Sequence, residues 1–107
     1  MPKLNILGNE YEVKIVDVAC TDYYGEIVDA TSEIRISDKR PTKVRFATLI
    51  HEMLHGINGH TGFPLGKEDK EEDVIILLGN AIADTLLRSG VITTEQIERY
   101  FNGNEAT

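Results

Sequence analysis

The feature that most limits the fold of this chain is a change in the period of its apolar residues near Pro41. Before this proline, apolar and polar residues alternate with period two, so that Tyr11, Val13 and Ile15 share one face of the segment "YEVKIVDV". After it, apolar residues recur with the spacing of an amphipathic helix. A chain that changes once from strand to helical periodicity is predicted to form an α+β fold, with a sheet followed by helices.

Four short strands are predicted before Pro41. We expect them in the segments "KLNIL", "YEVKIVDV", "GEIVD" and "SEIRIS". Gly8-Asn9, between the first two segments, indicates a two-residue hairpin turn. The prediction is therefore a small, mostly antiparallel sheet. The strand "EIRIS" is expected at an edge of this sheet, where an extended peptide could pair with it.

The first predicted helix covers "TKVRFATLIHEMLHGIN", with Pro41 in its first turn and no breaker before Gly56 and Gly59. Its apolar residues form two stripes. One stripe consists of Phe46, Ile50, Met53 and Ile57, and the other of Ala47, His51, Leu54 and His55. A helix that is apolar on two sides is expected at the centre of its domain.

Two further helices are predicted after a loop that is rich in glycine and proline. The second helix is expected over residues 68–89, with Gly90 as its stop. The third is short and ends at Phe101. It opens with a capping-box pattern, in which Thr93 is followed three residues later by Gln96.

The composition favours a small cytoplasmic protein. A length of 107 residues, of which 41% are hydrophobic, suits one domain with a modest core. The net charge of −7 argues against direct nucleic-acid binding, and we read the basic cluster within residues 35–45 as solvated. The single cysteine, Cys20, fits a reducing compartment. The first residues do not resemble a signal peptide, and no apolar run is long enough for a membrane span.

The strongest chemical signal is the order His-Glu-x-x-His within "RFATLIHEMLHGINGH". His51 and His55 are four residues apart, so on a helix both imidazoles can reach one zinc ion. Glu52 lies about 100° around the helix from His51, which suits it to face a water molecule at the metal rather than to bind the metal. Zinc lowers the pKa of such a water to about 7, and a neighbouring carboxylate can accept its proton.

A catalytic zinc site normally has a third protein ligand. His60 is one candidate, although its spacing from His55 is one residue short of the metzincin pattern. Glu68, Glu71 and Glu72 are the other candidates, because all three belong to the first turns of the second helix. We expect Glu71, with Glu72 as the alternative. The expectation depends on an apolar stripe that Glu71 would share, formed by Val74, Ile75, Leu78 and Ile82.

A donor beside the metal could stabilise the oxyanion of a tetrahedral intermediate. Tyr23, Tyr24, Tyr100 and His60 are the candidates in this sequence. His60 is favoured slightly over any one tyrosine, because a tyrosine in a small domain more often serves in packing.

The segment "TLIHEMLHGI", followed by "EEDVIILLGNAIADTLL" and preceded by a short sheet that ends in "EIRIS", resembles the small phage- and prophage-encoded zincins related to the ImmA/IrrE metallopeptidases. The resemblance covers roughly residues 4–88 and implies a gluzincin-type enzyme. In such an enzyme the two motif histidines and a glutamate of the next helix bind zinc, and the motif glutamate is the general base. The polar run "GKEDKEED" is about a turn longer than the resemblance leads us to expect, so Glu71 and Glu72 both stay open.

The expected function is that of a zinc-dependent metallopeptidase. His51, His55 and Glu71 would hold the zinc, and Glu52 would activate water for attack on a protein or peptide substrate. Residues 1–107 would form one zincin-like domain, with 102–107 as a flexible tail. For some members of the family, the resemblance implies cleavage of a repressor. The alternative is a non-enzymatic zinc-binding interaction module on the same scaffold, and hydrolysis of a small amide is a further alternative.

Overall fold

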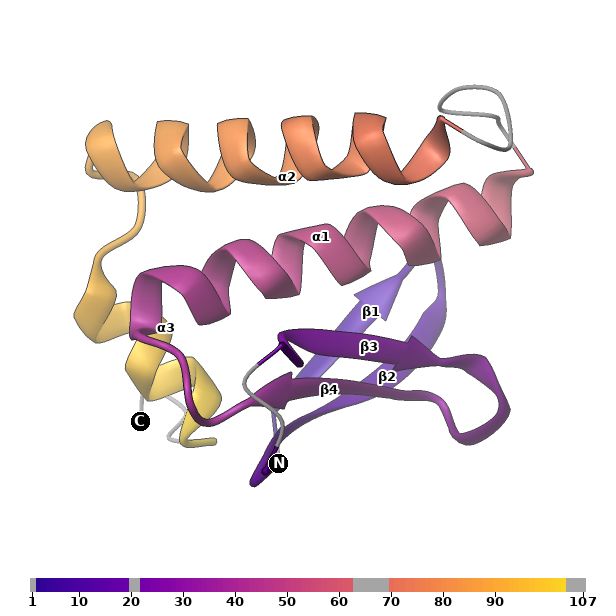
Figure 1. Ribbon diagram of the computed structural model, residues 1–107, viewed down its shortest axis with the longest axis horizontal. Helices are drawn as coiled ribbons and strands as arrows, with labels where there is room; N and C mark the ends of the chain where they lie inside the picture. Colours follow the sequence, from indigo (N-terminus) through magenta and orange to yellow (C-terminus); the bar gives the residue numbers. More distant parts are fainter. Residues whose placement is uncertain (1, 20–21, 63–69, 104–107) are drawn as a thin grey trace.

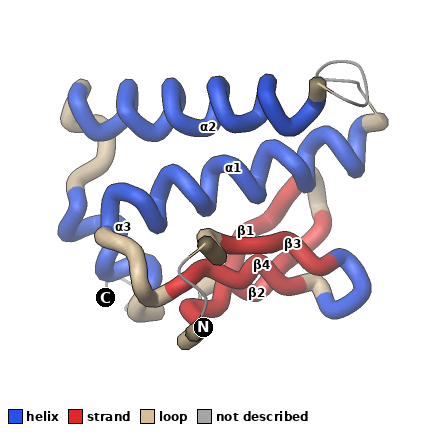
Figure 2. The backbone as a smooth tube through the Cα atoms, in the orientation of Figure 1, coloured by secondary structure: helices blue, strands red, loops and turns tan. Residues whose placement is uncertain are grey.

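The computed structural model describes residues 2–19, 22–62 and 70–103, and this part of the chain forms strands followed by α-helices. The strands are β1 (Lys3–Ile6), β2 (Asn9–Val16), β3 (Gly25–Val28) and β4 (Glu33–Ser37), and the helices are α1 (Thr42–Thr61), α2 (Glu71–Arg88) and α3 (Thr94–Phe101). The predicted α+β order is confirmed (Figure 2). Cys20, Glu68 and residues 104–107 of the expected tail lie outside the described residues.

The sheet has the strand order β1-β2-β4-β3 and is mostly antiparallel, as predicted. The exception is the pair β2–β4, which is parallel. β4 therefore lies inside the sheet, and the expectation that "EIRIS" is an edge strand is wrong. The reason is that β4 pairs on both sides, with β3 through the short 3-10 connection Asp29–Thr31 and with β2 in parallel, which leaves β3 at the edge.

The hairpin between β1 and β2 turns at Leu7-Gly8, one residue earlier than predicted. Ile6 pairs with Asn9, so only two residues lie outside the ladder. Leu7 has a φ of 53° and Gly8 a φ of 91°, and two successive residues with positive φ are typical of a type I′ turn. Glycine occupies the second position of the turn, which has the larger φ, because it has no Cβ to clash there.

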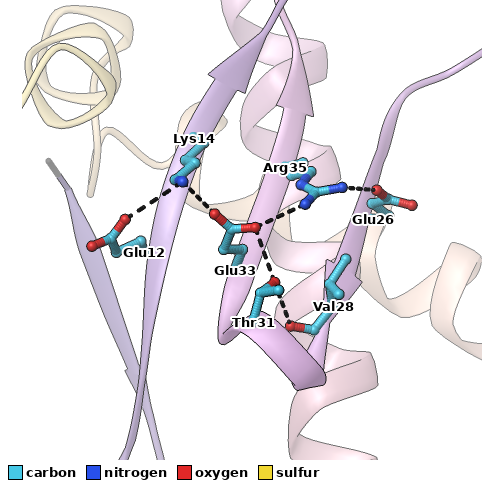
Figure 3. A network of polar contacts seen from close by, with 7 residues as sticks. All are labelled: Glu12, Lys14, Glu26, Val28, Thr31, Glu33 and Arg35. Carbon is cyan, nitrogen blue, oxygen red and sulfur yellow. Dashed lines mark hydrogen bonds and ion pairs between the residues drawn. The ribbon is translucent and has the colours of Figure 1, made fainter.

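The two faces of the sheet differ sharply in polarity. Val13, Ile34 and Ile36 are fully buried on the face toward the helices. On the opposite face, the Glu33 carboxylate accepts hydrogen bonds from Lys14, Arg35 and Thr31 (Figure 3). These hydrogen bonds lower the pKa of Glu33 to about 2. The network joins β2 to β4 on the solvent side of the sheet.

α1 is the central helix of the structure, as its two apolar stripes predict. It lies between the sheet and α2, and its first turns also contact α3 (Figure 1). The helix continues past Gly56 and Gly59 and ends at Gly62, whose φ of 66° suits a left-handed C-cap. α3 opens with the predicted capping box of Thr93 and Gln96. No helix in the described part of the chain is long and apolar enough to cross a membrane.

α2 packs on α1 through a face that matches the expected stripe only in part. Its buried residues are Ile75, Gly79 and Ala83. Ile75 belongs to the expected stripe, whereas Leu78, which the stripe also includes, is 37% exposed. The stripe was wrong at Leu78 because it counted only large apolar side chains, whereas Gly79 and Ala83 let the two helices approach closely.

Candidate metal centre

The two motif histidines lie on one face of α1 with their Nε2 atoms 3.2 Å apart. This closeness follows from the helix, because residues four apart lie one turn above each other. Both side chains are partly exposed and face α2. Burial lowers the pKa of His51, which favours the neutral imidazole that a metal requires.

Glu72, in the first turn of α2, completes a group of three possible ligands with His51 and His55. Its Oε1 lies 2.8 Å from Nε2 of His51, and its Oε2 lies 2.8 Å from Nε2 of His55. The two oxygen atoms of one carboxylate therefore contact the Nε2 atoms of both rings. The geometry favours Glu72, the alternative in the sequence analysis, over Glu71 as the third ligand.

Glu71 lies on the other side of the His55 ring. Its Oε1 is 3.5 Å from Nδ1 of His55 and accepts a hydrogen bond of 2.8 Å from the Asn58 side chain. Histidines that bind metals usually direct their second ring nitrogen to a carboxylate or carbonyl, which fixes the tautomer and the ring orientation. The placement of Glu71 suits this supporting role toward His55.

Glu52 is the only buried acidic side chain among the described residues, with 7% of its surface exposed. It follows His51 in the sequence, and both residues line a cleft between α1 and α2. Burial raises the pKa of Glu52 to about 7, and the nearby Glu72 carboxylate adds to the increase while His55 opposes it. A carboxyl group with a pKa near neutrality is suited to exchange protons with a reacting water.

His60 lies away from this group, at the last turn of α1. Its Nε2 is 2.6 Å from the hydroxyl of Tyr11, and that hydroxyl donates to Asp29 over 2.7 Å. Because a hydroxyl has one proton to donate, Nε2 of His60 must be the donor in the first contact. In this arrangement the nitrogen has no free lone pair for a metal.

A cleft of about 900 Å³ opens beside the group, between α1, α2 and the segment before β3. Tyr23 and Tyr24, two of the candidate oxyanion donors, line it together with His51. Burial raises the pKa of Tyr23, and the charge of Glu52 contributes to the increase. Tyr100 lies elsewhere, where its hydroxyl donates to the carbonyl of Lys3.

The sequence contains a signal for Glu72 that the apolar stripe concealed. A Cβ built on Gly79 would lie 3.4 Å from Cα of His51, so the α2 backbone passes close to the motif at that point. Glu72 is seven residues earlier, which is two helical turns, and therefore shares the face of Gly79. In α2, Gly79 and Ala83 mark the contact face better than Leu78 does.

The three side chains fit zinc in type and in spacing. Zinc accepts imidazole nitrogen and carboxylate oxygen at about 2.0–2.2 Å, which places tetrahedral ligands roughly 3.3 Å apart. The observed separations of 3.2 Å and 2.8 Å need only a small widening to reach that value. A set of two histidines and one carboxylate also leaves a fourth position open for water or substrate.

Comparison of the chain with models of known protein families, with curated proteins and with solved structures gave no match. The case for a function therefore depends on the geometry of this group and its cleft.

Proposed function

We propose that this protein is a zinc-dependent metallopeptidase whose metal ligands are His51, His55 and Glu72. The observation that carries the proposal is the convergence of both Nε2 atoms on one carboxylate, each at 2.8 Å, beside a buried glutamate. A purely structural site has no use for a buried carboxyl group next to an open metal position. The role expected of Glu71 changes from ligand to support of His55.

The residues would divide the reaction as follows. Zinc, when bound, would supply a Lewis acid that polarises the scissile carbonyl and makes water more acidic. Glu52 would accept a proton from the water as its oxygen bonds to the carbonyl carbon. It would then deliver that proton to the amine nitrogen as the C–N bond breaks. Tyr23 and Tyr24 are close enough to the cleft to serve as donors to the developing oxyanion.

Substitution of Glu52 tests the proposal. Glu52→Gln keeps the size of the side chain and removes the base, so hydrolysis of a peptide mixture should fall by about 10²–10⁴-fold while zinc is retained. Mass spectrometry of the peptides before and after incubation gives the readout. Asp73→Asn, an exposed neighbour of Glu72 on α2, is a matched control that should not change hydrolysis. Equal cleavage by the Glu52→Gln protein would contradict the proposed role of this residue.

A second candidate function, a non-enzymatic interaction module, is favoured by the outer face of α2. Leu77 is 70% exposed there, and Leu78 and Ala81 are also exposed. Exposed aliphatic side chains grouped on one helix are typical of surfaces that bind another protein. Survival of the biological effect of the protein in the Glu52→Gln variant would favour this function over hydrolysis.

A further inference from the structure

The cleft beside the metal centre extends along the groove between α1 and α2 toward the first turn of α1. On α1 it is lined by Val44, Ala47 and His51, which share one face of the helix. Val44 lies about 10 Å along the helix from His51, because each residue adds about 1.5 Å. The groove therefore continues from the candidate metal centre over a length that suits about three residues of an extended peptide.

Apolar side chains line part of this groove, together with the polar Thr48 and Asn80. Ala47 and Val44 of α1 and Ala83 and Leu87 of α2 line its far part, whereas Ile76 lines it one turn after Glu72. The two alanines leave space, and the larger aliphatic side chains form walls around it. Ile76 is 45% exposed even though it lines the cleft, so an apolar surface next to the candidate ligands stays in contact with solvent.

The charged residues of the cleft are mostly acidic. Asp22, Glu52, Glu72 and Asp84 line it, whereas Lys43 is the only lysine or arginine among its lining residues. Asp84 is held by Arg88, at 2.8 Å, on the solvent side of α2. With Asp84 paired to Arg88 and Glu72 assigned to the metal, Asp22 and Glu52 are the carboxylates that an acidic side chain of a substrate would meet here, and an uncharged side chain would meet no repulsion.

We propose that this groove binds an aliphatic or aromatic side chain of the substrate at a position next to the scissile bond, with Ile76 as a residue that determines specificity. The proposal rests on the proposed function, since it assigns a substrate class to the same site. Burial of the substrate side chain against the exposed Ile76 supplies the preference, and the charges of Asp22 and Glu52 disfavour an acidic residue.

The size of the preference follows from the contact that is gained. A hydrophobic pocket discriminates by about 10–200-fold for each methylene group, and a leucine side chain fills more of the groove than glycine does. We expect kcat/KM to be at least about 100-fold higher for leucine than for glycine at the favoured position. The ratio of leucine to glutamate should be larger still.

Competition between two peptides in one reaction tests the proposal. The two peptides differ only in having leucine or glutamate at the position next to the scissile bond. One pair of peptides has this position on the amino-terminal side of the bond, and a second pair has it on the carboxyl-terminal side. The ratio of the two cleavage rates does not depend on how much of the enzyme is folded or active. We expect Ile76→Lys to lower the leucine-to-glutamate ratio by about tenfold or more, because it removes apolar contact and adds a positive charge.

Leu77→Lys is the matched control. It introduces the same charge one residue away, but Leu77 points out of α2 and does not line the cleft. It should leave the ratio unchanged. Equal rates for leucine and glutamate peptides in the unsubstituted protein, or equal effects of the two lysine variants, would overturn the proposal.

A binding measurement separates failure of the inference from failure of the proposed function. Fluorescence anisotropy of a labelled leucine peptide with the Glu52→Gln protein should show binding that Ile76→Lys weakens at least about tenfold. Glu52-dependent cleavage without any preference would overturn the inference and leave the metallopeptidase. Selective binding without cleavage by the unsubstituted protein would overturn the metallopeptidase and keep the recognition. Neither binding nor cleavage would overturn both.

Discussion

Glu72 Oε1 lies 2.8 Å from Nε2 of His51, across the contact between α2 and α1. This contact depends on Gly79, two turns further along α2, where the backbones are close enough for a Cβ to touch the Cα of His51. The metal group is therefore assembled by the packing of two helices. Packing of α2 on α1 and formation of the centre should be coupled, and zinc should stabilise the fold when bound.

Substitution of His60 should leave the metal centre intact. His60→Ala removes the hydrogen bond to Tyr11, so the free energy of unfolding should fall by about 1 kcal/mol. Zinc content should stay the same as in the unsubstituted protein, because His60 lies outside the group of three ligands. Elemental analysis and urea unfolding give the two readouts. Loss of zinc with a folded His60→Ala protein would contradict the assignment of ligands.

Glu52→Gln should stabilise the metal-free protein. Burial raises the pKa of Glu52 in the folded state to about 7, compared with its usual value of 4.5. For such a group, stability is fully present below the usual pKa and is lost as the pH rises to the folded value. At about pH 8 the neutral glutamine should therefore add about 1–3 kcal/mol to the free energy of unfolding.

The same comparison at about pH 4 provides the control for this effect. There Glu52 is protonated in the folded state, so the two proteins should differ little in urea unfolding. A difference that does not change between the two pH values would show that charge burial is not the cause.

The sequence predicts the elements of this fold better than it predicts their arrangement. Alternation in "YEVKIVDV" and the capping box at Thr93 are local signals, and both were confirmed. Strand order depends on contacts that local periodicity does not record. For this reason the sequence did not predict the parallel pairing of β2 with β4 or the interior position of β4.

The candidate site shows the same division between local and long-range information. A single helix brings His51 and His55 together beside Glu72, and Glu52 to the adjoining cleft, so the spacing of the motif was sufficient to predict this part of the candidate site. The third ligand comes from another helix, and the choice between Glu71 and Glu72 depends on a rotation of about 100°. The buried positions of Ile75, Gly79 and Ala83 together show that rotation.

Two glycines of α1 should respond differently to alanine. A Cβ on Gly59 would meet no atom within 4 Å, so Gly59→Ala should raise the free energy of unfolding by about 0.5–1 kcal/mol through helix propensity. A Cβ on Gly56 would lie 2.7 Å from Cδ1 of the buried Ile6, and the overpacking should offset that gain. Urea unfolding should place Gly56→Ala at least about 1 kcal/mol below Gly59→Ala. Equal stability would contradict the packing of α1 on β1.

The network around Glu33 should make stability sensitive to acid. Hydrogen bonds from Lys14 and Arg35 lower the pKa of Glu33 in the folded state to about 2. The contribution of Glu33 to the free energy of unfolding is therefore present above pH 4.5, the usual pKa, and is lost as the pH falls toward 2. Glu33→Gln should therefore be less stable than the unsubstituted protein at about pH 7, and the difference should narrow by about pH 3. Glu10→Gln is the control, because both side chains of the Glu10–Lys3 ion pair are exposed and the pair should contribute little to the free energy of unfolding. A difference between Glu33→Gln and the unsubstituted protein that stays constant with pH would contradict the role of the network.

The most direct test of the metal centre is the zinc content of the purified protein beside Glu72→Ala and Glu71→Ala. The two residues are neighbours in the same turn, so the variants control for each other in charge and helix position. We predict about one zinc per chain in the unsubstituted protein, almost none in Glu72→Ala, and retained but weaker binding in Glu71→Ala, which loses only the support of His55. Loss of zinc in Glu71→Ala with full retention in Glu72→Ala would contradict the ligand assignment, and no zinc uptake by the unsubstituted protein would contradict the metal centre itself.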